Sequence, residues 1–125
     1  MKKSSFRPPE LKLNKDALNY AKKLIAQGKI DRASNSWFDN EPLIEQENHY
    51  LHENSWKQYS KWFLGIAPNT QTQTKEHYEF PIGDFKKIYR SGVVAVKERA
   101  AQWRQKQIEK AANELLKMID EDAQA

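Results

Sequence analysis

Cysteine is absent from this chain of 125 residues, and glycine and proline are scarce, at four and five residues. The lack of cysteine excludes a disulfide scaffold, a cysteine-ligated zinc finger and a thiol nucleophile. Because tight turns between strands usually need glycine, so few glycines argue against an all-β fold. The four glycines also lack the spacing of a phosphate-binding or dinucleotide-binding loop.

Long apolar stretches are missing as well. The chain starts with Lys2 and Lys3, as a secretory signal peptide would, but no apolar segment follows them. No run approaches the roughly 18 apolar residues of a membrane-spanning helix. We therefore expect a cytoplasmic protein that has no membrane partner.

The residues that are present suffice for one core. Hydrophobic residues make up 38% of the chain and aromatic residues 11%, including four tryptophans. The length fits one domain of the usual size, roughly 100–200 residues. Because Pro8 and Pro9 block a helix, we expect a flexible arm over residues 1–10. A single helical domain over 11–120 and a frayed tail over 121–125 complete the expected layout.

Apolar periodicity predicts four main helices and a shorter one. Asn14 is a suitable N-cap for the first helix, and Gly28 a suitable stop. Ser91 is the expected N-cap of a later helix. So few residues separate the last two helices that they should lie antiparallel. The main helices are expected over residues 15–27, 55–64, 91–103 and 106–120, and the shorter one over 41–48.

Residues 78–82 and 85–90 form two short alternating runs around Gly83 and Asp84. They predict a small β-hairpin at about 78–90, which Pro81 would confine to a sheet edge. The expected fold class is therefore mainly α, a compact four-helix domain with a small β-hairpin insertion. Its core should be dominated by Trp56, Tyr59, Phe63, Val96, Trp103, Leu115 and Ile119.

Charge is segregated along the chain, although the formal net charge is only +4. Residues 1–30 and 86–110 each carry eight basic against two acidic residues, whereas residues 31–55 carry one basic against six acidic residues. If the two basic blocks met in space, they would attract nucleic acid or an acidic partner. If the acidic segment folds against them, the charges compensate one another.

Six basic residues of the second block are candidates for contact with nucleic-acid phosphates: Lys86, Lys87, Arg90, Arg99, Arg104 and Lys106. Phosphate contacts of this kind give strongly salt-dependent binding. However, Glu98 and Glu109 interrupt the block, and the last helix lacks the exposed side chains that read base edges. A solvated charged surface is the alternative interpretation.

His49 and His52 lie near Glu45 and Glu53 and would offer two imidazoles to a metal ion if the segment were helical. Their i, i+3 spacing differs from the i, i+4 spacing of a zinc-protease motif. No serine lies in a nucleophile elbow, and Asp84 is better explained by turn chemistry. We therefore assign no catalytic residue, metal ligand or cofactor, and predict that the protein is not an enzyme.

Several aromatic and small-residue segments together resemble those of a known group of proteins. They are Leu24-Ile25, Gly28-Lys29, Trp37-Phe38, Trp56, Tyr59, Trp62-Phe63-Leu64-Gly65, Tyr78-Glu79-Phe80-Pro81, Gly83-Asp84-Phe85, Arg90-Ser91-Gly92, Arg99-Ala100-Ala101-Gln102, Ile108, Ala111-Ala112, Leu115-Leu116 and Ile119-Asp120. In them the chain is similar to an uncharacterised family of small bacterial proteins, and related segments occur in phage proteins associated with head maturation. The resemblance covers most of residues 20–120. It implies a shared fold and carries no catalytic set.

The leading hypothesis is a non-enzymatic structural or protein-interaction domain that binds another protein or itself. An exposed tryptophan would be a typical anchor for such a partner. The first alternative is nucleic-acid binding through the basic residues of 86–110. The second alternative is a small metal-dependent protein around His49 and His52.

Overall fold

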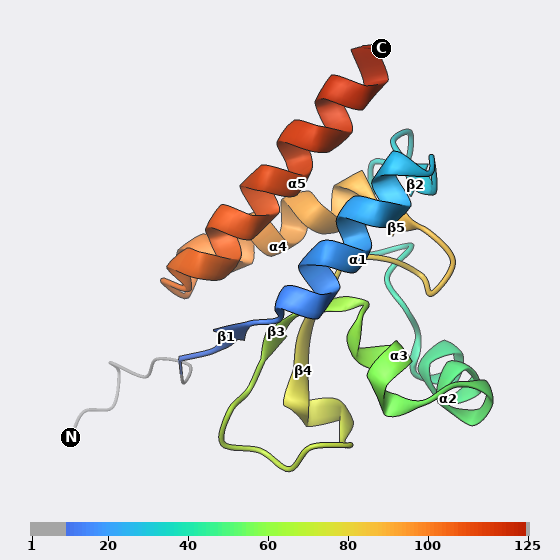
Figure 1. Ribbon diagram of the computed structural model, residues 1–125, viewed down its shortest axis with the longest axis vertical. Coiled ribbons are helices and arrows are strands. Elements are labelled where there is room, and N and C mark those ends of the chain that lie inside the picture. Colours follow the sequence, from blue (N-terminus) through green and yellow to red (C-terminus); the bar gives the residue numbers. More distant parts are fainter. Residues whose placement is uncertain (1–9, 125) are drawn as a thin grey trace.

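The computed structural model describes residues 10–124, with side chains up to Glu121 (Figure 1). This range holds five α-helices and five short strands. The helices are α1 (Lys15–Ala26), α2 (Ile44–Glu53), α3 (Trp56–Ser60), α4 (Arg90–Gln102) and α5 (Lys106–Gln124), with a 3-10 turn η1 (Lys75–His77). The strands are β1 (Lys12–Leu13), β2 (Ile30–Asp31), β3 (Phe63–Ile66), β4 (Tyr78–Pro81) and β5 (Ile88–Tyr89). None of the described helices is long and apolar enough to cross a membrane.

Helices α1, α4 and α5 pack together on one side of the molecule (Figure 1). Residue Arg90 at the start of α4 pairs with Asp120 near the end of α5, so the two helices are antiparallel, as predicted. Their contact surfaces are the predicted apolar stripes. The buried positions on the three helices are Ala17, Ala21, Leu24, Ile25, Val93, Val96, Ala100, Ile108, Ala111, Ala112, Leu115 and Ile119.

Two small sheets replace the predicted hairpin insertion. Strand β3 is the centre of a three-stranded antiparallel sheet in the order β1-β3-β4. Strands β2 and β5 form a separate parallel pair, with Ile30 opposite Ile88. The prediction of a mainly α, four-helix compact domain with a hairpin at about 78–90 is therefore wrong, because the fold is mixed α/β.

The two halves of the predicted hairpin belong to different sheets, since β4 pairs with β3 and β5 with β2. Only an isolated bridge between Gly83 and Ile88 joins them locally. Residue Pro81 lacks a backbone N–H, and Phe80 has a φ of +67°, so the strand cannot run regularly into a turn. The Asp84 carboxylate then accepts the backbone N–H groups of residues 86 and 87, which builds a loop in place of a tight hairpin turn.

The helix predicted over residues 55–64 ends early. Ser55 caps α3, and its hydroxyl accepts the N–H of Gln58 at 3.2 Å. The chain leaves the helix after Ser60 and becomes β3, so the second half of the prediction is wrong. The reason is tertiary, because the Asn14 side chain binds the carbonyls of Ser60 and Phe63 and holds this segment against β1.

The other helix ends differ in how well they were predicted. Asn14 caps α1, and Gly28 follows it at a φ of +80°, both as expected. The prediction of Ser91 as an N-cap is wrong, because α4 starts at Arg90 and the Ser91 hydroxyl is buried with no hydrogen-bond partner in the described structure. Helix α5 runs to Gln124, into the predicted tail. The predicted arm over 1–10 lies outside the described residues except for Glu10.

The core is centred on aromatic rings. Five of the seven predicted core residues are buried, namely Tyr59, Phe63, Val96, Leu115 and Ile119. Trp56 and Trp103 instead lie partly exposed at its edge. The largest buried side chain is Trp62, which was not in the predicted set.

Candidate interaction surface

Three large apolar side chains are exposed on one short segment of the chain. Phe38 is 84% exposed, Leu43 60% and Ile44 71%. They are the large hydrophobic side chains most open to solvent in the part of the chain that the structure describes. We call these three residues the apolar ridge.

The backbone beneath Phe38 is held in a hydrogen-bonded turn. The N–H groups of Asn40 and Glu41 donate to the Trp37 carbonyl at 2.9 and 2.7 Å. The Asn40 amide also donates to the Ser34 hydroxyl at 2.6 Å and to the Ser36 carbonyl at 2.7 Å. Phe38 is thus presented outwards from an ordered turn, as a binding side chain would be.

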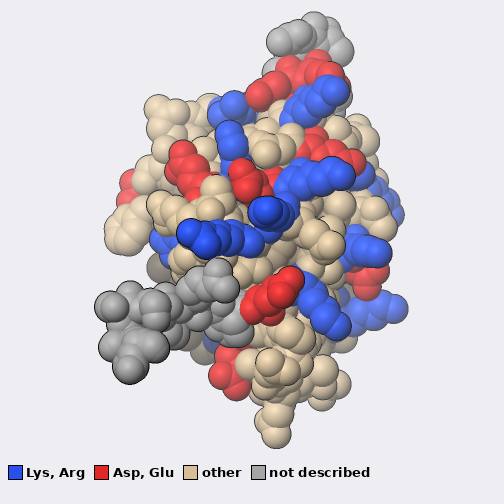
Figure 2. Space-filling view, turned by 90° about the vertical axis from the view of Figure 1, so that its left-hand side faces the viewer, with Lys and Arg blue, Asp and Glu red and all other residues tan. Residues whose placement is uncertain are grey.

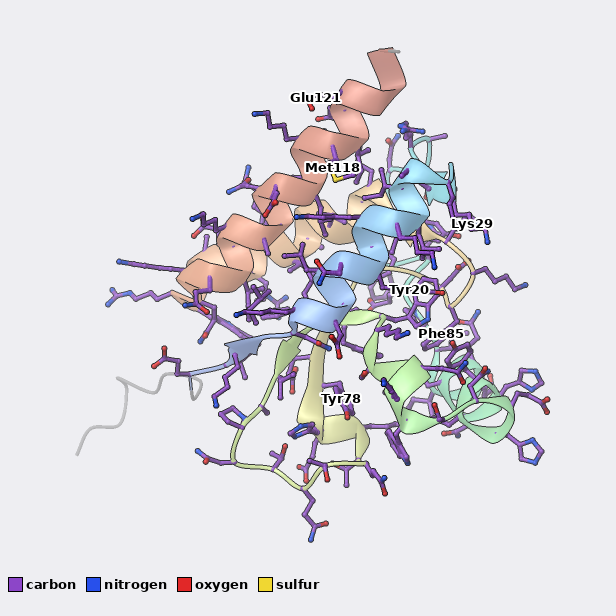
Figure 3. The ribbon with its side chains drawn as sticks, viewed as in Figure 1. Tyr20, Lys29, Tyr78, Phe85, Met118 and Glu121 are labelled. Atoms are coloured by element: carbon purple, nitrogen blue, oxygen red, sulfur yellow. The ribbon has the colours of Figure 1, made fainter. Side chains whose placement is uncertain are left out.

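Ile44 is the first residue of helix α2 and Leu43 is its N-cap, and none of the residues of α2 is buried. Tyr50 stacks on Phe85 with 4.5 Å between ring centroids, and Figure 3 shows Phe85 in the loop beside α2 and α3. The Lys75 ammonium donates to Asn48 at 2.6 Å and lies 3.5 Å from the Glu47 carboxylate. These contacts fix one side of α2 and leave its first turn, with Ile44, facing solvent.

A cleft of about 230 Å³ lies beside the ridge, between the 37–41 turn, β4 and α4. We call it the Trp37–Trp103 cleft. Trp37 packs against Gly92, where an added Cβ would lie 3.0 Å from the ring. On the other side Trp103 packs against Phe80, with 5.5 Å between the ring centroids. The lining residues are Trp37, Glu41, Glu79, Phe80, Pro81, Ala95, Val96, Arg99 and Trp103.

The cleft holds two carboxylates, Glu41 and Glu79. Burial raises the pKa of Glu79 above its ordinary value. Among residues 10–121, neither carboxylate has an ion-pair or hydrogen-bond partner. The one cation lining the cleft, the Arg99 guanidinium, lies 5.3 Å from the centre of the Trp103 ring.

The six predicted phosphate-binding residues fall into two groups at opposite ends of α4. Residues 86, 87 and 90 lie at its start, and residues 99, 104 and 106 lie near its end. A helix of 13 residues is about 20 Å long, so the groups are well separated. The six residues therefore do not form one cluster.

Three of these six residues also have intramolecular partners. Lys87 lies 3.5 Å from the Asp84 carboxylate, Arg90 makes two hydrogen bonds to Asp120 at 2.8 and 3.1 Å, and Arg99 covers the Trp103 ring. On the side of the molecule that carries the α4–α5 connection, acidic side chains lie between basic ones (Figure 2).

Contacts with Lys87 and Arg90 help to lower the pKa values of Asp84 and Asp120. Burial opposes ionisation of Asp84, but N–H groups of residues 86 and 87, the Tyr89 hydroxyl and the Lys87 ammonium outweigh it and lower the Asp84 pKa. Hydrogen bonds from Arg90 lower the pKa of Asp120. Both carboxylates are thus engaged in holding the fold.

The histidines do not converge. His49 and His52 are exposed on α2, and the His52 Nδ1 lies 3.1 Å from the Glu53 carboxylate. His77 is buried, with its Nδ1 2.9 Å from the Thr70 hydroxyl. Within the described residues, no three histidine, aspartate or glutamate side chains are grouped so that they could hold a metal ion.

Comparisons of the chain with protein-family models, with curated proteins and with solved structures found no match. The resemblance to small bacterial and phage-associated proteins therefore stays a prediction. Sequence reasoning missed Glu41 and Glu79, although Glu79 between two aromatic residues was a usable signal. Trp37, one of the four tryptophans, is only partly exposed.

Proposed function

We propose that this protein is a non-enzymatic interaction domain that binds another protein through the apolar ridge. The observation that carries this proposal is the exposure of Phe38, Leu43 and Ile44 on ordered backbone. Burying one such side chain in a complex is worth about 1.5–3 kcal/mol. A partner that covers all three would gain enough to offset a substantial part of the entropy lost on association.

The charge around the ridge indicates which kind of partner fits. Asp39, Glu41 and Glu45 lie next to the ridge residues in a segment with a strong acidic excess. Negative charge repels nucleic-acid phosphates and anionic lipid headgroups, and it attracts basic side chains. We therefore expect a protein partner with apolar and basic residues. A cytoplasmic location and a phage connection stay predictions.

Replacing Phe38 and Ile44 together by serine should weaken partner binding at least tenfold, because it removes two apolar anchors from the ridge. Immobilised wild-type and variant proteins are compared in capture from an extract of the native host, and the captured protein is then purified and titrated directly. Both side chains are exposed, so the free energy of unfolding should change by no more than about 0.5 kcal/mol. Gln71→Ser, at an exposed position in the loop before η1, is the matched control.

A partner that binds the double variant as tightly as the wild type would overturn the proposal. Sedimentation of the wild type over a range of concentrations separates a second copy of this chain from a different protein. If the partner is a second copy, the Phe38→Ser, Ile44→Ser variant sediments as a monomer where the wild type does not.

Nucleic-acid binding is a second candidate, favoured by one cleft. Lys12, Arg104 and Lys106 line a cleft of about 590 Å³ at the start of α5. Titration of labelled single- and double-stranded oligonucleotides at 20 and 150 mM salt tests it. Micromolar binding that weakens steeply as the salt concentration rises would support this candidate, provided that the Arg104→Ala variant binds more weakly than the wild type. The leading proposal predicts no binding at 150 mM salt.

A further inference from the structure

The Trp37–Trp103 cleft adjoins the ridge through the turn that carries both Trp37 and Phe38. We propose that this cleft receives an arginine side chain of the protein partner, stacked on the tryptophan rings and paired with the Glu79 carboxylate. This inference rests on the proposed function, since the same partner would cover the ridge. Its test below uses only the cleft, so the two can fail separately.

The walls of the cleft have the chemistry that binds a guanidinium group. The faces of aromatic rings carry negative potential, which attracts cations, and the partly exposed Trp37 and Trp103 line the cleft. Arg99 already places its guanidinium 5.3 Å from the Trp103 ring centre, so this wall accepts such a group within the protein itself. A guanidinium is planar and weakly hydrated, so it stacks on indole better than an ammonium does.

The lining of the cleft has an excess of negative charge. Two carboxylates, Glu41 and Glu79, and one cation, Arg99, line the cleft, and neither carboxylate has a hydrogen-bond partner among residues 10–121. One further positive charge would balance the site. An arginine can supply two parallel hydrogen bonds to a carboxylate, which a lysine cannot. The volume of about 230 Å³ has room for a guanidinium and its stem.

The geometry of β4 argues for a side chain rather than an added strand as the occupant. Strand β4 is the edge of its sheet and borders the cleft. Pro81 lacks an N–H, and Phe80 adopts a φ of +67°, which a bulky residue avoids. A partner strand therefore finds no regular edge to pair with. Backbone strain of this kind persists where the surroundings enforce it, often at binding sites.

The probe is the peptide Ac-Ala-Arg-Ala-NH2, followed through the indole N–H signals of Trp37 and Trp103 in amide NMR spectra. We expect both signals to shift with a dissociation constant in the millimolar range. Glu79→Gln should weaken binding about tenfold, and Glu41→Gln about two- to threefold. Glu76→Gln, an exposed glutamate on η1 that loses the same charge, should bind as the wild type.

A purely structural role for Glu79 would not produce the same pair of effects. Since burial disfavours the charged Glu79 carboxylate, Glu79→Gln should raise Tm at pH 7 while it lowers affinity. Glu41 and Arg99 are the other charged residues that line this cleft. A raised folded-state pKa means that the penalty is absent at low pH and appears as the pH rises, so the Tm gain should vanish in acid.

Three results would overturn the inference. In the first, the tryptophan signals do not move at tens of millimolar arginine peptide. In the second, the Glu79→Gln variant binds the arginine peptide as tightly as the wild type does. In the third, the wild type binds Ac-Ala-Lys-Ala-NH2 or Ac-Ala-Glu-Ala-NH2 as tightly as the arginine peptide. Neither Phe38 nor Ile44 lines the cleft, so the Phe38→Ser, Ile44→Ser variant should bind the peptide normally. Loss of partner binding in that variant with intact peptide binding supports both statements. If the arginine peptide does not bind but the double variant still loses partner binding, only the arginine site is rejected.

Discussion

Replacing Asn14 by alanine should lower the free energy of unfolding by about 3 kcal/mol. The Asn14 side chain is buried and its amide donates to the carbonyls of Ser60 and Phe63, at 2.9 and 3.0 Å. Its oxygen also accepts the N–H of Ala17 and caps α1, at 3.4 Å. Each buried carbonyl left without a donor costs about 1–3 kcal/mol, and a lost N-cap costs about 1 kcal/mol.

Urea unfolding followed by tryptophan fluorescence measures this loss. Asn14→Asp is the sharper variant, because a carboxylate still caps Ala17 but offers no donor to the two carbonyls. It should destabilise the protein at least as much as alanine does. Asn19→Ala, exposed on the same helix, should change stability by no more than about 0.5 kcal/mol. A loss below about 1 kcal/mol in Asn14→Ala would show that the α3–β3 junction does not depend on these bonds.

Replacing Gly83 by alanine should destabilise the protein by about 3 kcal/mol. An added Cβ would clash with the Lys87 carbonyl oxygen and lie 2.7 Å from the Trp62 ring. Overpacking a core usually costs about 1–3 kcal/mol. The upper end applies because one obstacle is backbone and the other is the largest buried side chain.

Thermal and urea denaturation measure the Gly83→Ala loss, and near-ultraviolet circular dichroism reports on the environment of Trp62. Gly28→Ala is the matched control, since nothing lies within 4 Å of its Cβ position. Its φ of +80° gives it a cost of about 1–2 kcal/mol from backbone strain alone. Equal losses at the two positions would contradict the packing described around Trp62.

Local signals were enough to predict the long helices. The apolar stripe of α5 repeats over several turns, and Asn14 and Gly28 mark the ends of α1 by their own chemistry. Both kinds of signal depend on residues close together in the sequence. Helices α1, α4 and α5 were therefore placed to within a few residues.

The sequence pattern did not predict the pairing of strands that lie far apart in the chain. Strand β1 at 12–13 pairs with 65–66, and two-residue strands have no periodicity to detect. The run that becomes β3 is apolar on both sides, so its aromatic residues suit a helix as well as a buried strand. The hairpin prediction failed for a related reason. Its first half, β4, pairs with β3, and its second half, β5, pairs with β2, so the two halves do not pair with each other.

The candidate site was predicted only in part. Phe38 and Ile44 are apolar, and composition alone assigns such residues to a core, so their exposure needed the tertiary structure. The basic block was a candidate for a single surface, and the structure does not bring its residues together. Its members are close in sequence, but the length of α4 separates them in space. Charge runs predict a surface only when the elements that carry them are already placed.

Photo-crosslinking from position 38 tests the interaction surface most directly. Phe38 is replaced by p-benzoylphenylalanine, which the exposure of this side chain should tolerate, and the variant is irradiated in extract from the native host. We predict one dominant adduct to a protein rich in basic residues near the crosslinked site. The same probe at Gln71 should not form that adduct. No adduct at position 38, or the same adduct from both positions, would contradict the proposed interaction surface.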